Sequence, residues 1–175
     1  GGKGANLAEM TSLKIPVPPG FTISTDACVY YMKHNKYPSG FKKQVISALK
    51  TVELKMNRKF GDSNNPLLLS VRSGARQSMP GMMETVLNIG LNEKTISGLI
   101  NKTNNDRFAY DSYRRLITMY ADVVMEKSNN LGFEIRITLE KILHDVKKKN
   151  KIILDSELKV GELKLLCEKY EKLIN

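Results

Sequence analysis

The predicted fold is decided by residues 67–91, LLLSVRSGARQSMPGMMETVLNIGL. Leu67 to Val71 is an apolar run of strand length, which predicts a strand that is buried on both faces. Residues 73–83 are rich in small and polar residues and contain Pro80-Gly81, which predicts a loop. Thr85 to Leu91 predicts a second strand. The stretch therefore predicts two strands joined by a long loop.

The residues before this hairpin predict short helices and extended turns. Residues 1–4 predict a flexible glycine turn that opens into a helix ending before Pro16. Phe21 to Ser24 predicts a short strand, followed by a helix to about Asn35. A longer helix is predicted from an apolar series that stops at Gly61: Phe41, Val45, Leu49, Val52, Met56 and Phe60.

The residues after the hairpin predict helices only. Asn105 or Asp106 starts a helix whose apolar side contains Phe108, Tyr113, Leu116, Tyr120 and Val124. Two further helices are predicted at 133–149 and 156–174, the last with Asp155 as its N-cap. The predicted fold class is α+β, with a mixed α/β subdomain at 1–91 and a helical subdomain at 92–175.

Composition is that of a soluble globular protein, with 41% hydrophobic and 26% charged residues among 175. No segment approaches the roughly 20 apolar residues of a membrane-spanning helix, so no membrane association is predicted. Cys28 and Cys167 show no paired spacing and are predicted to be reduced and buried. His34 and His144 are predicted to be ordinary surface residues, and no metal site is predicted.

The net charge of +10 is concentrated in the first part of the chain. Residues 1–100 carry 13 basic and 6 acidic side chains, whereas residues 101–175 carry 15 and 12. The excess therefore coincides with the glycine-rich segments, which favours a phosphate ligand. Nucleic-acid binding is the alternative, but only 7% of residues are aromatic and most tyrosines have helical core spacing.

Two segments are candidates for phosphate binding. In the first, Lys3 lies among glycines that let the backbone approach an anion ahead of a helix. In the second, Arg72 ends a strand and offers a bidentate guanidinium, and Arg76, Ser78 and Gly81 follow on a loop able to cover a triphosphate. Each segment is also compatible with a plain exposed loop.

Four stretches together resemble the pyruvate phosphate dikinase family: residues 1–10, the Pro-rich turn to Gly20-Phe21, residues 70–92 and residues 107–115. The related phosphoenolpyruvate synthases and rifampicin phosphotransferases share the GGK opening and the SVRS strand. They do not usually show residues 78–85 followed by 88–92. That run favours the dikinase over a synthase-type phosphotransferase.

The resemblance implies a partial ATP-grasp nucleotide-binding domain. It implies that Lys3 and Arg72 hold the ATP phosphates, and that Gly81 lies in a mobile loop over them, with Arg76 and Ser78 as weaker candidates. The Mg²⁺ ligands, the phosphorylated histidine and the pyruvate site are expected on other parts of a longer, homodimeric cytoplasmic enzyme. No catalytic or metal residue is expected here, and the fragment alone is expected to be inactive. The alternative is a folded fragment that binds no nucleotide.

Overall fold

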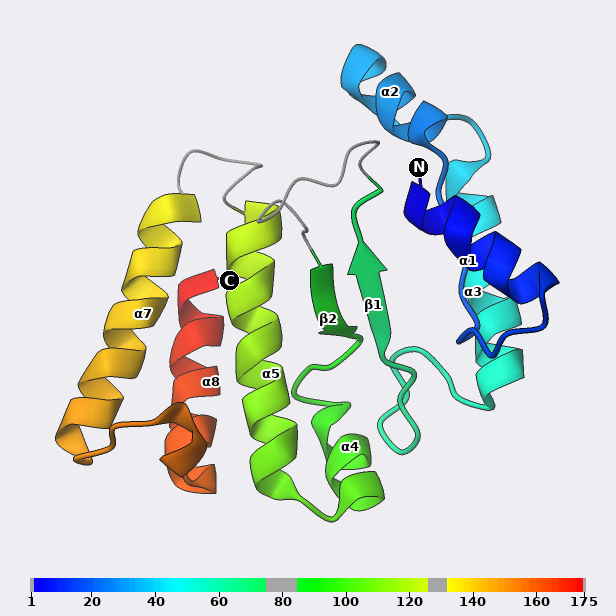
Figure 1. Cartoon of the computed structure of the whole chain (residues 1–175). Helices are drawn as coiled ribbons and strands as arrows, with labels where there is room; N and C mark the ends of the chain where they lie inside the picture. Colours follow the sequence, from blue (N-terminus) through cyan, green and yellow to red (C-terminus); the bar gives the residue numbers. More distant parts are fainter. Residues whose placement is uncertain (1, 75–84, 126–131, 175) are drawn as a thin grey trace. The chain divides into compact units, whose positions relative to one another are not determined.

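A computed structural model of the chain describes residues 2–74, 85–125 and 132–174. These residues form two compact units (Figure 1). The first unit comprises residues 1–58 and 73–83, and the second comprises residues 59–72 and 84–175.

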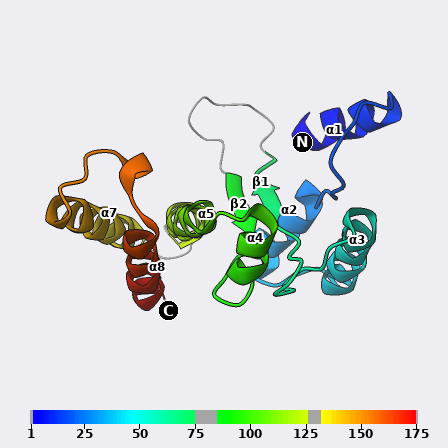
Figure 2. The ribbon, with the colours of Figure 1, turned by 90° about the horizontal axis from the view of Figure 1, so that it is seen from below.

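The second unit contains a two-stranded antiparallel sheet and most of the helices. Its strands are β1 (Leu69–Arg72) and β2 (Thr85–Ile89). Its helical elements are α4 (Ile96–Thr103), α5 (Asp106–Tyr120), the π-helical turn η1 (Ala121–Met125), α7 (Gly132–Lys149), the 3-10 turn η2 (Asp155–Glu157) and α8 (Val160–Ile174). In Figure 2, α5 lies between the hairpin on one side and α7 with α8 on the other. The structure therefore confirms the predicted α+β class, since it contains helices and a small antiparallel sheet.

The predicted hairpin is confirmed. Leu69 pairs with Ile89, Val71 with Val86 and Arg72 with Thr85, with a bulge between Leu69 and Val71. The prediction that the first strand is buried on both faces is wrong. Of residues 67–71, Leu67 is buried, Leu68 and Leu69 are half-buried, and Ser70 and Val71 are exposed. The reason is that β1 is an edge strand, with β2 as its neighbour among the described residues.

Gly90 closes the hairpin onto the turn before β1. Its φ of +108° is one that side-chain-bearing residues rarely adopt. A Cβ at this position would also lie 2.8 Å from the Leu67 carbonyl oxygen and 2.9 Å from the Phe60 ring. The close approach of these two backbone segments therefore requires glycine.

The core of the second unit lies between α5 and α8, with β2 and α7 packed against them. Leu163, Leu166 and Tyr170 on α8 are buried, as is Leu158 just before this helix, whereas Leu173 near its end is exposed. On α5 the prediction holds only in part. Tyr113 and Leu116 are buried, but Phe108, Tyr120 and Val124 are exposed, and the core is instead completed by Ala109, Ser112, Ile117 and Ala121.

The helix ends show which local predictions were sound. Asn105 caps α5 as predicted, because its side chain accepts a hydrogen bond of 2.9 Å from the Phe108 amide. Asp155 does not cap α8, which begins only at Val160. Asp155 begins η2 instead, where its carboxylate binds nearby cationic side chains. The predicted N-cap was therefore wrong because tertiary ion pairs compete for the carboxylate.

The first unit contains α1 (Gly2–Ser12), α2 (Thr25–His34) and α3 (Phe41–Met56). The expected glycine turn at residues 2–4 is wrong, because α1 already begins at Gly2 and glycine accepts helical dihedral angles at a cost of about 1 kcal/mol. The predicted strand at 21–24 is also wrong. These residues are part of no strand, because a strand needs a neighbour for its backbone groups.

The third helix ends earlier than predicted. Asn57 adopts the left-handed conformation with a φ of +50°, and its amide bonds the carbonyls of Glu53 and Leu54. Asparagine tolerates this conformation better than most residues, so it ends the helix before Phe60. Phe60 and Gly61 consequently lie beyond α3, in the second unit.

The first unit buries few of its apolar side chains. Neither α1 nor α2 has a fully buried residue, and α3 has only Val52. Cys28 is exposed, so the prediction of two buried thiols is wrong for this residue, whereas Cys167 is buried. Among the described residues, α1, α2 and α3 make no extensive contact with one another.

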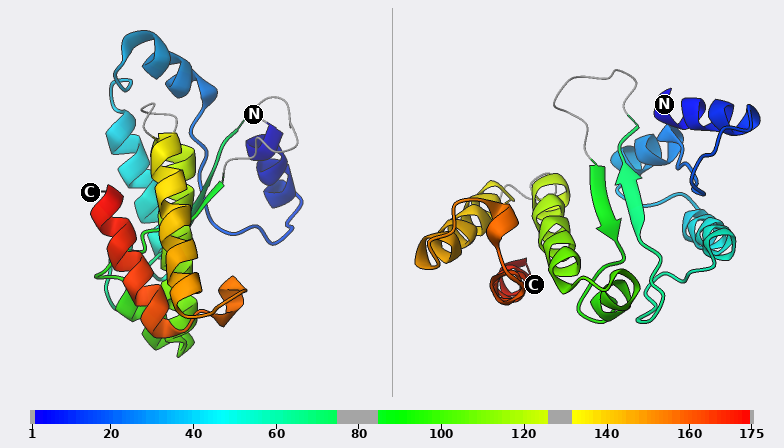
Figure 3. Two further views of the ribbon diagram at one scale, coloured as in Figure 1. Left: turned by 90° about the vertical axis from the view of Figure 1, so that its left-hand side faces the viewer. Right: turned by 60° about the horizontal axis from the view of Figure 1, so that its bottom comes forward.

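The compact units do not coincide with the predicted division at residues 91 and 92. The hairpin strands group with the helices that follow them, because β2 packs directly on α5 (Figure 3). Ser73 and Gly74, directly after β1, group with α1 to α3 instead.

Candidate phosphate-binding site

The Lys3 side chain is positioned by the first turn of α1. Its ammonium group donates a hydrogen bond of 2.9 Å to the backbone carbonyl of Ser73, 70 residues further along the chain. Ser73 directly follows Arg72. The two segments singled out in the sequence therefore meet at this hydrogen bond. An ammonium group has three N–H donors, so two remain for other acceptors such as phosphate oxygens.

The first turn of α1 adds backbone donors beside Lys3. The first four amides of a helix lack intrahelical partners, and the helix dipole makes this end partly positive. Gly4 packs closely on Thr22, since a Cβ at residue 4 would lie 3.0 Å from Thr22 Cγ2 and 3.2 Å from its hydroxyl oxygen. Gly2 has open space around it, with nothing within 4 Å. Of these two glycines, only Gly4 is closely packed, and Thr22 was not found from the sequence because its contact depends on the fold.

Arg72 is the last residue of β1 and is exposed. Among residues 2–74, 85–125 and 132–174, its guanidinium has no hydrogen-bond or ion-pair partner. Arg76, Ser78 and Gly81, the other predicted phosphate-binding residues, lie outside the described residues. The structure therefore brings together Lys3 and the residue after Arg72.

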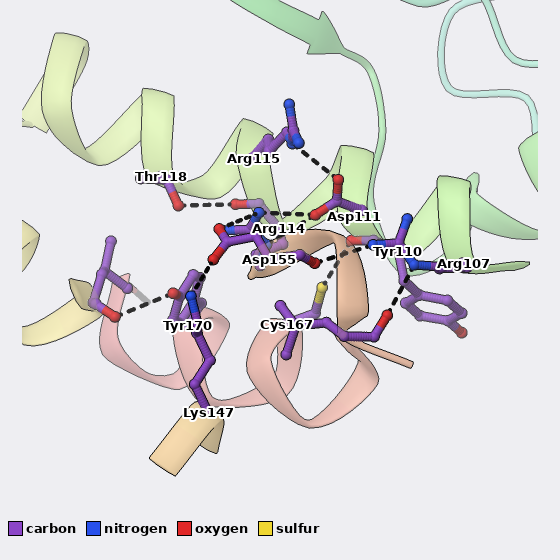
Figure 4. Close-up of polar contacts among 12 residues, drawn as sticks. Arg107, Tyr110, Asp111, Arg114, Arg115, Thr118, Lys147, Asp155, Cys167 and Tyr170 are labelled. Atoms are coloured by element: carbon purple, nitrogen blue, oxygen red, sulfur yellow. Dashed lines mark hydrogen bonds and ion pairs between the residues drawn. The ribbon is translucent and has the colours of Figure 1, made fainter. Parts of the chain in front are cut away.

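The arginines of the stretch 107–115 have structural partners (Figure 4). Arg114 is buried and donates to the Asp111 carboxylate at 2.8 and 3.1 Å. Arg115 binds the other oxygen of Asp111 at 2.9 Å from the solvent side. Arg107 donates to the backbone carbonyls of Leu158 at 2.9 Å and Asp155 at 3.0 Å. Arg107 and Arg114 therefore join α5 to the segment before α8, whereas Arg115 pairs within α5.

Asp155 is the centre of this polar cluster. Its carboxylate accepts a hydrogen bond of 2.8 Å from the Lys147 ammonium and lies 3.4 Å from the Arg114 guanidinium. The hydrogen bond from Lys147, with the charges of Arg114, Lys147 and Arg115, holds the pKa of Asp155 below its usual value, although burial acts in the opposite direction. The last turn of α7 contains three lysines, Lys147, Lys148 and Lys149. Lys148 and Lys149 are exposed, but Lys147 is used in this cluster.

A second group of polar side chains lies where α5 meets α8. The Tyr113 hydroxyl donates to the Glu171 carboxylate. Burial, followed by the nearby carboxylates of Glu93 and Glu168, raises the pKa of Glu171. Burial likewise raises the pKa of the Cys167 thiol to about 12, so this cysteine is an unreactive core residue.

Neither histidine lies in a site. His144 is highly exposed and lies 3.8 Å from the Asp145 carboxylate, and His34 is exposed, with its ring tilted against that of Tyr30. Among residues 2–74, 85–125 and 132–174, no three histidine, cysteine or acidic side chains lie close enough to hold a metal ion. Within the same residues, no helix has the length and apolar character needed to cross a membrane.

Comparison with known proteins identifies the family that the chain resembles. Residues 1–41 match the family model described as the AMP/ATP-binding domain of pyruvate phosphate dikinase. Over 172 residues, 98% of this chain, the sequence is 48% identical to the pyruvate, phosphate dikinase of Clostridium symbiosum and to the chloroplastic pyruvate, phosphate dikinase of Mesembryanthemum crystallinum. It is also 48% identical over 173 residues to that of Giardia intestinalis.

The chain belongs to the pyruvate, phosphate dikinase family. It spans 19% of the length of the Clostridium and Giardia relatives and 17% of the Mesembryanthemum relative. The predicted family is thus confirmed. A cytoplasmic location stays a prediction, because some of the relatives are named chloroplastic.

Proposed function

We propose that this chain supplies the phosphate-binding part of the ATP site of a pyruvate, phosphate dikinase. Lys3 and Arg72 contact the phosphates, and Arg76, Ser78 and Gly81 belong to the loop that approaches them. The observation that carries the proposal is the hydrogen bond between the Lys3 ammonium and the Ser73 carbonyl. It links the start of α1 to the residue that follows Arg72. The ATP-grasp type of fold is part of the same proposal.

The chemistry of this arrangement suits phosphoryl transfer. A lysine provides a point charge, and an arginine provides a planar pair of donors that matches two phosphate oxygens. Such groups stabilise the charge that develops on the transferring phosphates. The neighbouring first turn of α1 adds backbone N–H donors, which attract an anion as the two cationic side chains do.

In the whole enzyme, ATP, phosphate and pyruvate are converted into AMP, pyrophosphate and phosphoenolpyruvate through a phosphohistidine. The histidine, the pyruvate site and the ligands for Mg²⁺ belong to parts of a homodimeric dikinase other than these residues. The chain alone therefore catalyses no turnover. Phosphoenolpyruvate formation by the 175-residue chain without added domains would contradict this assignment.

The test is a calorimetric titration of the chain with Mg·ATP, repeated with Lys3→Ala and Arg72→Ala. Lys33→Ala is the matched control, because Lys33 is an exposed lysine at the end of α2 and does not belong to the proposed site. Saturable binding that is lost in the first two variants and kept in the control supports the proposal. Binding that survives both substitutions would contradict the roles of Lys3 and Arg72.

The alternative is a folded chain that binds no nucleotide without the rest of the domain. It predicts a cooperative melt that Mg·ATP does not shift. In that case the roles of Lys3 and Arg72 are tested in a full-length dikinase. There, loss of one phosphate-binding cation is expected to lower the rate by roughly 10²–10³.

A further inference from the structure

The chain leaves α1 through a helix cap made of backbone hydrogen bonds. Lys14 adopts the left-handed conformation with a φ of +59°. The Ile15 amide donates a hydrogen bond of 3.0 Å to the Met10 carbonyl. The Lys14 amide donates one of 3.0 Å to the Thr11 carbonyl. Together these bonds form a Schellman motif, after which the segment turns back and leads to α2 (Figure 1).

The returning segment is stiff because it is rich in proline. It contains Pro16, Pro18 and Pro19, and residues 15–24 form neither helix nor strand. Proline locks its own φ and restricts the residue before it. An extended segment of this kind spans about 3.1 Å per residue, against about 1.5 Å per residue for a helix. The segment is therefore long enough to return along α1 to its first turn.

Thr22, near the end of this segment, contacts α1 at Gly4, the residue after Lys3. A Cβ on Gly4 would lie 3.0 Å from Thr22 Cγ2, 3.2 Å from Thr22 Oγ1 and 3.7 Å from Thr22 Cβ. Both branches of the threonine side chain therefore face the Cα of Gly4. Thr22 itself is exposed, whereas Gly4 is half-buried.

Two contacts thus hold the first turn of α1 at neighbouring residues. The Lys3 ammonium donates its hydrogen bond of 2.9 Å to the Ser73 carbonyl, and Thr22 packs against the backbone at Gly4. A lysine side chain is long and flexible, so the position of its ammonium group depends on the backbone from which it extends. The contact at Gly4 acts on that backbone, whereas the contact at Ser73 acts on the ammonium group.

We propose that Thr22 is a positioning residue of the ATP site, whose packing on Gly4 sets the first turn of α1 and so directs Lys3 to the phosphates. This inference rests on the proposed function and adds to it a residue that acts through Lys3 and touches no phosphate. It assigns the role to the shape of the side chain and not to its hydroxyl group. Valine has the same branched shape, whereas serine keeps the hydroxyl group and lacks the methyl group.

The first measurement compares three variants in a full-length dikinase in which residues 1–175 replace the matching segment of the Clostridium symbiosum enzyme. Thr22→Val should keep kcat/KM for ATP within about twofold, as for a neutral surface substitution. Thr22→Ser and Thr22→Ala should lower it roughly tenfold, less than the roughly 10²-fold cost of a 1 Å misplacement. Three unchanged values would overturn the proposal. A loss in Thr22→Val with none in Thr22→Ser would also overturn it, because the hydroxyl group would then be the active part.

A second measurement moves the methyl group from one side of the contact to the other. Thr22→Ala leaves the Cβ of residue 22, which would lie 3.7 Å from a Cβ at residue 4, an ordinary van der Waals distance. Adding Gly4→Ala to Thr22→Ala should therefore recover part of the lost kcat/KM. Gly2→Ala is the matched control, because it gives the same turn the same gain in helix propensity but has nothing within 4 Å. Equal values for the two double variants would overturn the proposal.

A double-mutant cycle with Lys3 separates positioning from a general structural role. If Thr22 acts through Lys3, Thr22→Ala should lower kcat/KM no further once Lys3→Ala is present. The same loss in both backgrounds would show a general structural role and overturn the proposal. The cycle also distinguishes this inference from the proposed function. An unchanged kcat/KM in Lys3→Ala would contradict both, whereas a loss in Lys3→Ala with none in Thr22→Ala would contradict the inference alone.

Discussion

The two compact units of this chain differ in how they bury apolar side chains. In the second unit, α5 and α8 share a core that contains Leu163, Leu166 and Tyr170, with exposed fractions of 1% or less. In the first unit, α1 and α2 contain no fully buried residue. A stable domain needs enough burial to offset the loss of chain entropy. The second unit therefore has the features of a self-supporting fold, whereas the first depends on further contacts.

This difference bears on function because the proposed phosphate-binding lysine belongs to the dependent unit. Lys3 lies in α1, and the hydrogen bond to Ser73 is the long-range polar contact that holds its ammonium group. One hydrogen bond contributes roughly 0.5–1.5 kcal/mol. We therefore expect the geometry at Lys3 to depend on whatever covers α1.

The largest expected contrast is between two leucine truncations. Leu166→Ala removes a fully buried side chain from α8 and should lower the free energy of unfolding of the second unit by about 4 kcal/mol, within the roughly 2–5 kcal/mol range for such sites. Leu13→Ala alters an exposed side chain and should change the free energy by less than about 0.5 kcal/mol. Urea unfolding followed by circular dichroism measures both. Equal effects would contradict the comparison between the units.

The polar cluster around Asp155 offers a contrast between two neighbouring arginines. Arg114→Ala should cost about 3 kcal/mol, the low end for a broken buried ion pair, because Asp111 and Asp155 keep other cationic partners. Arg115→Ala removes a partner of Asp111 whose side chain is 63% exposed, and it should cost less than about 1 kcal/mol. Thermal melts of both variants provide the measurement. A larger loss from Arg115→Ala would contradict the structural role given to Arg114.

A smaller contrast is expected between two helical glycines of the second unit. A Cβ at Gly98 would lie 2.5 Å from Pro66 Cδ and 2.6 Å from the Ser63 carbonyl oxygen, so Gly98→Ala should destabilise by about 1–3 kcal/mol through overpacking. A Cβ at Gly161, near the start of α8, would meet no atom within 4 Å, and Gly161→Ala should stabilise by about 0.4–1 kcal/mol. Differential scanning calorimetry distinguishes the two directions. A stabilising Gly98→Ala would show that α4 does not pack on residues 63–66.

The smallest expected effect is a pH dependence that originates at Asp155. The pKa of this carboxyl is lowered in the folded chain, first by the hydrogen bond from Lys147. Its contribution to stability is therefore present above the ordinary aspartate pKa of about 3.9 and is lost as the pH falls through the lowered value. Compared with Asp155→Asn, the unsubstituted chain should be most favoured near neutral pH, and the difference should shrink on acidification. Glu140→Gln is the control, because Glu140 lies at an exposed site on α7 away from the Asp155 cluster. A difference that grows on acidification would contradict the assigned role of Asp155.

Local sequence patterns predicted the elements that depend on local contacts. The hairpin followed from a strand-like run on each side of a loop with Pro80-Gly81. The start of α5 followed from Asn105, which is close in sequence to the amide that it caps. The predictions at 21–24 and at Phe60 failed for a different reason. Residues 21–24 form no strand, because a strand needs a neighbouring strand for its backbone hydrogen bonds. Helix α3 ends before Phe60, because Asn57 adopts the left-handed conformation and caps it.

Contacts between distant residues could not be predicted from such patterns. No spacing rule indicated that Arg114 would be buried, or that Asp155 would bind Lys147 instead of capping α8. The candidate phosphate-binding site shows the same difference between local patterns and contacts of distant residues. Lys3 and Arg72 were chosen from residue type and the surrounding glycines, but the contact of Lys3 with Ser73 appears only in the fold. The parts assigned to Arg76, Ser78 and Gly81 stay predictions.

The most direct test of this account is hydrogen exchange of the 175-residue chain, measured residue by residue. We expect slow exchange for the amides of α5 and α8, because their hydrogen bonds open only with the core of the second unit. We expect rapid exchange for the amides of α1 and α2, including the turn that carries Lys3. Equally slow exchange in both units would show that the first unit is stable by itself, and this would contradict the account.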